Sequence, residues 1–320
     1  MPILIECLSH TPLHGYYDPA PEIVAEVERV QHEARARVEA FDPEFVVAFA
    51  PDHYNGFFYD VMPQFCIGIA ATAIGDFNSL AGPLDVPEET ALALAEAVLA
   101  SEVDVSVSYR MQVDHGCAQA LNVLTGGLDR YPVVPVFINS VASPMASSRR
   151  SRLLGDAIGR VLSRTGKRVL VIGSGGISHE PPVPEIAGAN AEVAERLIAG
   201  RNPTAESRAA REARTVAAAK SFTAGDSHLH PLNPEWDRAF LELLAAGDIA
   251  AVDGMTNAGI TRNGGKSAHE IRTWIAAFGA LAAYGSYRAS LDYYRPIPEW
   301  IAGFGAMHAQ PETQGDCHVQ

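Results

Sequence analysis

Four of the eleven histidines stand shortly after apolar runs that are expected to form β-strands. They are His10 in LSHTP, His53 in APDHYNGFF, His115 in MQVDHG and His179 in GSGGISHEPP. Ligands of open α/β sheets bind outside the carboxyl ends of the strands, so the four imidazoles are expected to meet in one pocket. Imidazole is the commonest metal ligand and titrates near neutrality. The cluster therefore predicts a metal site, proton transfer, or both.

Glu270, in GGKSAHEIRTW, is the best candidate for a carboxylate ligand. It lies just inside the start of a predicted helix, Ser267–Tyr287, where a negative charge is well tolerated. The apolar face that includes Ile271, Trp274 and Phe278 would pack this helix towards the sheet. Redox-active iron(II) typically takes two histidines and one carboxylate on one face and keeps its other positions open. The alternative is an ordinary acidic residue in the first turn of an amphipathic helix.

Three weaker motifs accompany the cluster. GSGGIS at 173–178 lacks the third glycine of a dinucleotide fingerprint, so its glycines are expected to let the backbone approach closely beside His179. His228 and His230, in SHLHP, form a weak candidate metal pair in a predicted loop. His269 neighbours Glu270, and adjacent helix residues point about 100° apart, so it is a candidate for supporting the ligands.

The elements that must position these residues alternate between strands and helices in the first half of the chain. We predict strands at Ile3–Cys7, Glu44–Ala50, Val103–Ser108, Val133–Asn139 and Arg168–Gly173. We predict helices at Ala20–Phe41, Pro87–Ala100, Cys117–Gly126, Ser147–Thr165, Ala189–Ala199, Thr204–Phe222, Asn233–Ala245 and Ser267–Tyr287. This pattern is typical of an α/β fold with a mostly parallel central sheet flanked by helices.

The expected organisation is one catalytic domain over residues 1–320. Residues 1–185 would form the α/β part, and residues 186–305 a mainly helical part that is packed onto the sheet and carries Glu270. Residues 306–320 would form a polar tail.

Composition narrows the function classes. The chain has 24 Lys and Arg against 38 Asp and Glu, a formal charge of −14, so nucleic-acid binding is not expected. No apolar run approaches the ~18–20 residues that span a bilayer, so no membrane partner is expected. The four cysteines, Cys7, Cys66, Cys117 and Cys317, form no CxxC pair and fit reduced thiols. We therefore expect a soluble, cytoplasmic protein.

Nine segments together resemble the class III extradiol ring-cleaving dioxygenases, the superfamily of the protocatechuate 4,5-dioxygenase catalytic subunit. The similarity runs from residue 1 to about residue 305, and Ala187–Ser227 matches only loosely. The segments are LSHTPL, FAPDHYNGFFYDVMPQFC, ATAIGDF, VSYRMQVDHG, PVFINSVA, GSGGISHEPPVPE, HPLNPEWD, KSAHEIRTWIAAFGA and YYRPIPEWIAGFG.

This resemblance implies a role for each candidate residue. His10, His53 and Glu270 would bind Fe(II), His115 would be the proton donor and His179 the proton acceptor. The substrates would be O2 and a catechol, 3-(2,3-dihydroxyphenyl)propionate or 2,3-dihydroxycinnamate, and the product a 2-hydroxy-6-oxo-dienedioate. The family also implies a homo-oligomer.

The propionate group of such a substrate requires a cation or amide donor. Arg110, Arg272 and Arg295 are candidates that spacing cannot separate. Tyr54, Asn55, Phe57 and Phe58 follow His53 and are candidates for the ring pocket, although core packing is an equal expectation for the two phenylalanines.

Two alternatives use the same residues. A zinc hydrolase would use the His/Glu cluster to activate water. A non-catalytic binding member of the fold would be expected to lack one of the five residues, whereas this chain retains all five.

Overall fold

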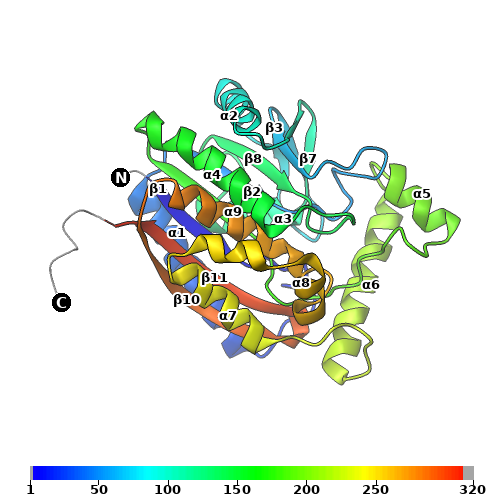
Figure 1. Cartoon of the computed structure of the whole chain (residues 1–320). Helices are drawn as coiled ribbons and strands as arrows, with labels where there is room; N and C mark the ends of the chain where they lie inside the picture. Colours follow the sequence, from blue (N-terminus) through cyan, green and yellow to red (C-terminus); the bar gives the residue numbers. More distant parts are fainter. Residues whose placement is uncertain (1–2, 313–320) are drawn as a thin grey trace.

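The computed structural model describes residues 3–312, and Figure 1 shows their arrangement. The strands are β1 (Ile3–Leu8), β2 (Phe45–Ala50), β3 (Phe65–Gly68), β4 (Ala71–Ile74), β5 (Ala81–Pro83), β6 (Ser106–Ser108), β7 (Met111–Val113), β8 (Val133–Ile138), β9 (Val169–Ser174), β10 (Tyr287–Ile297) and β11 (Ala302–Pro311). The α-helices are α1 (Pro21–Phe41), α2 (Glu88–Ala100), α3 (His115–Thr125), α4 (Ser148–Thr165), α5 (Ala191–Ala199), α6 (Ala205–Ala224), α7 (Pro234–Ala245), α8 (Asn257–Gly264) and α9 (Ile271–Ala282). Short 3-10 helices are η1 (Ile249–Gly254), η2 (Ala268–Glu270) and η3 (Pro298–Trp300).

An eight-stranded sheet in the order β10-β11-β1-β9-β2-β8-β3-β6 forms the centre of the molecule. Its four middle strands, β1, β9, β2 and β8, pair in parallel and are buried along their whole length. A parallel sheet covered on both faces requires such continuous Val/Ile-rich runs, which is why the sequence pattern predicted them. The α/β prediction is confirmed.

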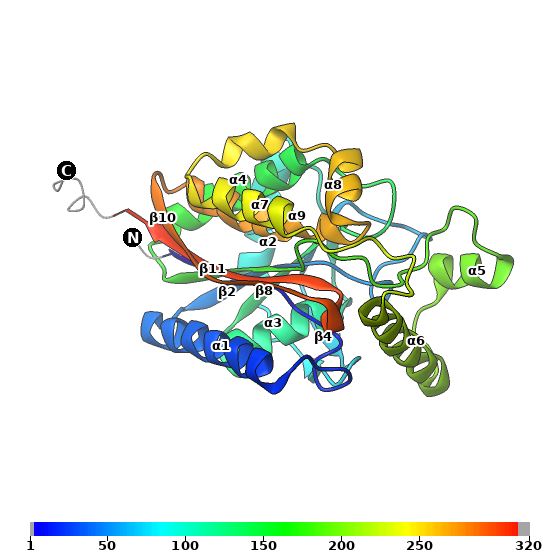
Figure 2. The same cartoon turned by 90° about the horizontal axis from the view of Figure 1, so that it is seen from below.

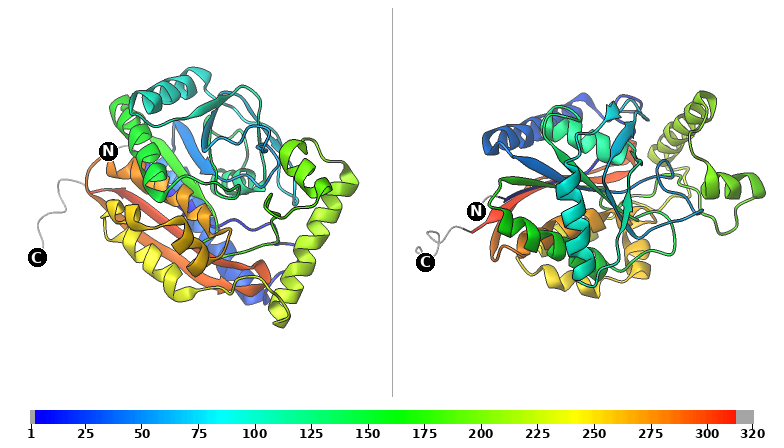
Figure 3. Two further views of the ribbon diagram at one scale, coloured as in Figure 1. Left: turned by 45° about the vertical axis from the view of Figure 1, so that its right-hand side comes forward. Right: turned by 90° about the horizontal axis from the view of Figure 1, so that it is seen from above.

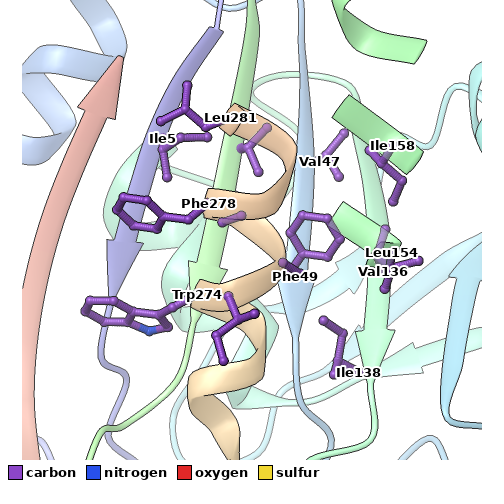
Figure 4. Packing of buried hydrophobic residues seen from close by; sticks show 14 of the residues in the cluster. Ile5, Val47, Phe49, Val136, Ile138, Leu154, Ile158, Trp274, Phe278 and Leu281 are labelled. Carbon is purple, nitrogen blue, oxygen red and sulfur yellow. The ribbon is translucent and has the colours of Figure 1, made fainter. Parts of the chain in front are cut away.

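Helices cover both faces of the sheet, as Figure 2 shows. Alternate residues of β1 point to opposite sides: Leu4 packs with α1 and α3, whereas Ile5 packs with α4 and α9. Helix α9 lies directly on the middle strands, and Figure 4 shows its Trp274 and Phe278 against that face. Because α9 follows Glu270 without a break, its packing fixes where that carboxylate lies.

Replacing Phe278 by alanine is expected to lower the free energy of unfolding by about 3–5 kcal/mol. The ring is fully buried between α9 and the sheet, so its removal leaves a cavity that the close-packed layers cannot fill. Leu99→Ala is the control, because Leu99 is 53% exposed on α2 and should change stability by less than about 0.5 kcal/mol. Urea unfolding of both variants measures the difference, and equal stabilities would contradict this packing.

Helices α5 and α6 project from the body of the molecule beside the carboxyl ends of the central strands, as Figure 3 shows. Their contact with the body includes backbone hydrogen bonds from Tyr59 to Leu197 and from Asp60 to Ile198. A second sheet of three strands, β5-β4-β7, lies on the same side as α3. No helix among residues 3–312 is long and apolar enough to cross a membrane.

The predicted C-terminal tail is wrong for residues 306–311. Strand β11 runs to Pro311 and pairs antiparallel with both β1 and β10, so the chain returns to the central sheet after its helical part. The predicted helix Ser267–Tyr287 is also shorter, since α9 ends at Ala282 and Tyr287 begins β10. Residues 313–320, with Cys317, lie outside the described part of the chain.

Candidate active site

Three neighbouring parallel strands deliver three of the predicted histidines to one edge of the sheet. His10 follows β1, His179 follows β9 and His53 follows β2, and these strands are adjacent in the order β1-β9-β2. Parallel strands end at the same edge of the sheet, so His10 and His53 become neighbours although 43 positions separate them in the chain. The ring centroids of His10 and His53 are 5.6 Å apart.

Glu270 reaches the same point from the other side. It is the last residue of η2, and a Cβ added at Gly175 would lie only 2.7 Å from the Glu270 Cβ, so only glycine allows α9 to approach β9 this closely. The amide N–H of Gly176 donates to Glu270 Oε2 at 3.0 Å. The prediction that the glycines of GSGGIS permit close backbone approach beside His179 is confirmed, because a Cβ at Gly176 would lie 2.8 Å from the His179 ring.

The carboxylate of Glu270 is fully buried among three imidazoles. Its Oε1 lies 3.0 Å from His53 Nε2 and 3.2 Å from His179 Nε2, and its Oε2 lies 3.6 Å from His10 Nε2. The three side chains predicted as metal ligands therefore present their donor atoms to one another.

The hydrogen bonds behind these histidines identify which ring nitrogen is free. His53 Nδ1 lies 2.9 Å from Asp114 Oδ2, an acceptor, so this nitrogen carries the proton. His10 Nδ1 lies 3.0 Å from Ser174 Oγ, whose own hydroxyl donates to the carbonyl of Gly116, so His10 Nδ1 must donate as well. The Nε2 of His10 is then left with a lone pair on the side of Glu270. The Nε2 of His53, 3.0 Å from Glu270 Oε1, is the atom through which His53 would bind a metal once its proton leaves.

The pKa shifts of the three candidate ligands differ in direction. Burial tends to raise the pKa of the Glu270 carboxyl, but His179 and His10 outweigh it and hold that pKa well below its usual range. Burial lowers the pKa of His10 to about 3, so this ring is neutral. Burial also opposes charge on His53, but Asp114 and Glu270 outweigh it and raise the pKa of His53. Without a metal, His53 therefore shares a proton with Glu270, and a divalent cation bound by this N, N, O donor set would take the place of that proton.

His115 approaches the cluster from another element. It is the first residue of α3, whose N-cap residue Asp114 accepts a hydrogen bond from Gly116 N. The strand that precedes α3 in the chain is β7 of the three-stranded sheet. The strand before His115 is thus β7, which lies outside the predicted strand Val103–Ser108, and His115 still reaches the other histidines. Its ring stacks on His53 with centroids 4.6 Å apart.

Asp76 holds the His115 ring in place. Its Oδ2 lies 2.7 Å from His115 Nδ1 and its Oδ1 accepts from the backbone N–H of His115 at 2.8 Å. Burial tends to raise the pKa of Asp76, but His115 outweighs it, so the pKa falls below the usual value and the carboxylate stays ionised. The Nδ1–H of His115 is thereby fixed, and Nε2 is left for chemistry.

All five predicted residues line one cavity of about 360 Å³. The cavity is bounded by Pro12 and Leu13, by the segment Pro181–Pro184, by Trp300 and by α5 and α6. A space of this size accommodates a substituted aromatic ring.

A second ligand set is also within reach of a metal. Ring nitrogens of His10, His53 and His115 lie within 4.8 Å of one another, as do donor atoms of Asp76, Asp114 and His115. The geometry thus offers a three-histidine alternative to the set of two histidines and Glu270.

The other predicted pocket residues divide into two groups. Tyr54 and Asn55 line the cavity. Phe57 instead stacks on Phe137 with centroids 3.8 Å apart, and Phe58 is completely buried, so both phenylalanines belong to the core.

None of the three arginines suggested for the propionate group lines the cavity. Arg272 is buried and donates to the Ala146 carbonyl and to Asn257 Oδ1, and Arg295 pairs with Glu26. Arg110 is exposed near the small sheet. These suggestions are wrong. The arginines that line the cavity are four others, which lie on α5 and α6.

The weaker histidine candidates lie apart from the cluster. His230 places one ring nitrogen 2.9 Å from the Arg262 carbonyl and the other 2.7 Å from the Pro231 carbonyl, so backbone groups occupy both; His228 is exposed. His269 is buried behind the ligands, and its Nε2 lies 2.8 Å from Thr261 Oγ1.

Residues that sequence reasoning missed include the carboxylates that orient the histidines. Asp114 contacts His53, which lies 61 positions earlier, and Asp76 contacts His115, which lies 39 positions later. Asp114 adjoins His115 in the motif VDHG, but that motif does not reveal a partner so far away in the chain.

Comparison with known proteins identifies the family of this chain. The family described as the catalytic LigB subunit of aromatic ring-opening dioxygenase matches residues 4–305. A protein of Cupriavidus pinatubonensis named 2,3-dihydroxyphenylpropionate/2,3-dihydroxicinnamic acid 1,2-dioxygenase is 79% identical over 97% of this chain and 99% of its own. Proteins with this name in Paraburkholderia phymatum (77% identical, 98% and 99% covered) and Pseudomonas putida (61% identical, 93% and 96% covered) also match. The chain therefore belongs to the family of catalytic subunits of aromatic ring-opening dioxygenases.

Proposed function

We propose that this enzyme is a non-haem Fe(II) extradiol dioxygenase that cleaves the ring of 3-(2,3-dihydroxyphenyl)propionate, and of 2,3-dihydroxycinnamate, with O2. The observation that supports this most strongly is the convergence of His10, His53 and Glu270, with His115 and His179 on the same cavity. The names of the similar proteins supply the substrate class.

His10, His53 and Glu270 would hold the iron, through the two Nε2 atoms and the carboxylate. When bound, iron(II) supplies the electrons and open positions that allow dioxygen to react with a catechol. The chain itself orients these donors: Asp114 fixes His53, Ser174 fixes His10, and Gly176 N–H supports Glu270. Loss of a hydrogen-bond partner of this kind typically lowers metal affinity or activity by about 10–100-fold.

His179 is the proposed base for the catechol. It lines the cavity, its Nε2 lies next to Glu270, and its exposed fraction of 8% leaves it accessible to a ligand. Removal of a hydroxyl proton makes the catechol a better chelator, and an imidazole is a suitable base for that transfer.

His115 is the proposed proton donor to the oxygen that becomes negative during ring cleavage. The Asp76 carboxylate, 2.7 Å from Nδ1, fixes the ring and leaves Nε2 as the atom that would give up a proton. Two histidines with separate partners allow the protein to remove one proton and return another within one cycle.

Replacing Asp76 by asparagine is expected to lower kcat by at least about tenfold while the iron content stays at one per chain. The amide would turn a donor, or a neutral acceptor, towards His115 Nδ1, so the ring would lose the charged partner that holds it. Asp129→Asn, an exposed site, is the control. Unchanged kcat in Asp76→Asn would show that the Asp76–His115 pair does not serve the reaction.

Oxygen consumption tests the proposed function directly. The Fe(II) enzyme with 3-(2,3-dihydroxyphenyl)propionate is expected to consume one O2 per substrate and to give a yellow ring-opened product. A zinc hydrolase would consume no O2 and would stay active when air is excluded, and a binding protein would give no product. Either result would overturn the proposal.

Assembly as a homo-oligomer and a cytoplasmic location belong to the same proposal. Strand β10 lies at the edge of the large sheet, where a second copy could pair with it. Cys7, Cys66 and Cys117 are buried free thiols, as a reducing compartment favours. Light scattering on the purified protein measures the assembly, and a monomer at working concentrations would contradict it.

A further inference from the structure

The wall of the cavity opposite the sheet is rich in arginine. Arg208, Arg211 and Arg214 of α6 line it, and Arg196 of α5 lines it as well. Among the described residues around this cavity, Glu270 is the one acidic side chain. A chain with a net charge of −14 thus concentrates positive charge at this place, which requires a local reason.

Helix geometry explains why three of these side chains act together. Residues three and four apart lie on the same face of a helix, so Arg208, Arg211 and Arg214 form one row. Ser207 and Thr215 line the cavity beside them. We call Arg208, Arg211 and Arg214 the arginine face.

Two of the three side chains of the arginine face have no carboxylate partner within residues 3–312. Arg208 donates to one backbone carbonyl, that of Ile74, at 3.2 Å. Within residues 3–312, the guanidinium of Arg214 has no hydrogen bond or ion pair. Guanidinium groups that line a largely apolar cavity are suited to an anionic ligand.

Arg211 is the best-positioned member of the arginine face. It donates to Asn55 Oδ1 at 2.8 Å, lies 3.8 Å from Asp76 Oδ2, and its guanidinium carbon stands 5.4 Å from the centre of the Phe77 ring. Phe77 in turn contacts His115, with ring centroids 5.0 Å apart. Asn55 takes one N–H, so most of the five guanidinium donors remain for a ligand held beside the predicted metal site.

We propose that the arginine face binds the carboxylate at the end of the substrate's side chain, with Arg211 as the main contact, and so selects 3-substituted catechols that end in a carboxylate. This inference rests on the proposed function, which supplies the catechol. In this arrangement, the diol of the substrate would lie near His53 and Glu270. The carboxylate of its side chain would lie at the arginine face, away from the Glu270 carboxylate. Arg→Gln keeps much of the side-chain length and removes the charge.

The test compares a charged with an uncharged catechol. The Fe(II) enzyme and its Arg208→Gln, Arg211→Gln and Arg214→Gln variants are assayed with 3-(2,3-dihydroxyphenyl)propionate and with 3-propylcatechol. A hydrogen bond to a charged group contributes about 1.5–3 kcal/mol, so Arg211→Gln should raise KM for the propionate by about 10–100-fold. KM for 3-propylcatechol should change by less than about threefold, because that substrate has no carboxylate to lose a partner. Arg208→Gln and Arg214→Gln should give smaller changes in the same direction.

Arg160→Gln is the matched control, since Arg160 pairs with Asp156 on the surface of α4 and the variant loses the same charge. Rising salt should weaken the wild-type preference for the propionate, since exposed charge pairs are screened. The proposal is overturned if the preference for propionate over 3-propylcatechol survives in the triple Arg208→Gln, Arg211→Gln, Arg214→Gln variant. It is also overturned if that variant loses both substrates equally. If the wild-type enzyme cleaves neither catechol, the proposed function itself fails and this inference with it.

Discussion

Glu270→Gln is expected to abolish stoichiometric iron binding, and turnover with it. The side chain is fully buried, and its two oxygens face His10, His53 and His179 at 3.0–3.6 Å. A neutral amide removes the only anion among these donors, and its NH2 group would face lone pairs where a cation should lie. Iron per chain, measured after anaerobic loading and desalting, should fall from one to well below one tenth of the sites.

His53→Ala should give the same loss of iron, because it removes an Nε2 donor that Asp114 holds in place. Glu33→Gln is the control, since Glu33 pairs with Arg29 on the exposed face of α1. If Glu270→Gln kept its iron while His115→Ala lost it, the three-histidine set of His10, His53 and His115 would be the metal site instead.

His115→Ala and His179→Ala are expected to keep iron and lose turnover. Each positioned acid or base typically contributes about 10²–10⁴-fold, so kcat should fall by that factor in each variant. The rings line the cavity, and in the proposed ligand set neither is needed to hold the metal. Stopped-flow assays of product formation, with iron content measured on the same samples, separate these effects.

His32→Ala, on the exposed side of α1, is the control for replacing a histidine. A His179→Ala enzyme with near-normal kcat would refute its role as the base. Loss of iron from His115→Ala would likewise refute a purely proton-transferring role for His115.

The parts of the site that follow buried strands were predictable from the sequence. His10 and His53 come within a few residues of continuous apolar runs, and the parallel order of β1, β9 and β2 then brings them together with His179. Glu270 was recognisable because the helix after it is apolar enough to be buried. Local pattern and topology sufficed for these residues.

The edge of the sheet was not predictable in the same way. Strand β11 has the sequence AGFGAMHAQP, and its small residues carry little strand propensity, yet it is almost entirely buried because it pairs with β1 on one side and β10 on the other. Strand β10 mixes charged and aromatic residues and lies at the sheet edge. Tertiary pairing, rather than local preference, makes these segments strands.

The residues that support the site were not predictable from the sequence, for a related reason. Asp76 and Asp114 act through partners far away in the chain. The arginine face lies on α6, within the segment where the sequence resembles the family only loosely. Its spacing of three residues was visible in the sequence, but only the fold shows that this side of α6 faces the cavity.

The most direct test of the account is to locate the iron. A crystal of the Fe(II)-loaded protein, kept anaerobic, would show the metal by anomalous scattering at the iron absorption edge. The account predicts one peak per chain, bonded to His10 Nε2, His53 Nε2 and a Glu270 oxygen, with His115 and His179 on the open side. A peak at Asp76, Asp114 and His115, or none within reach of Glu270, would contradict it.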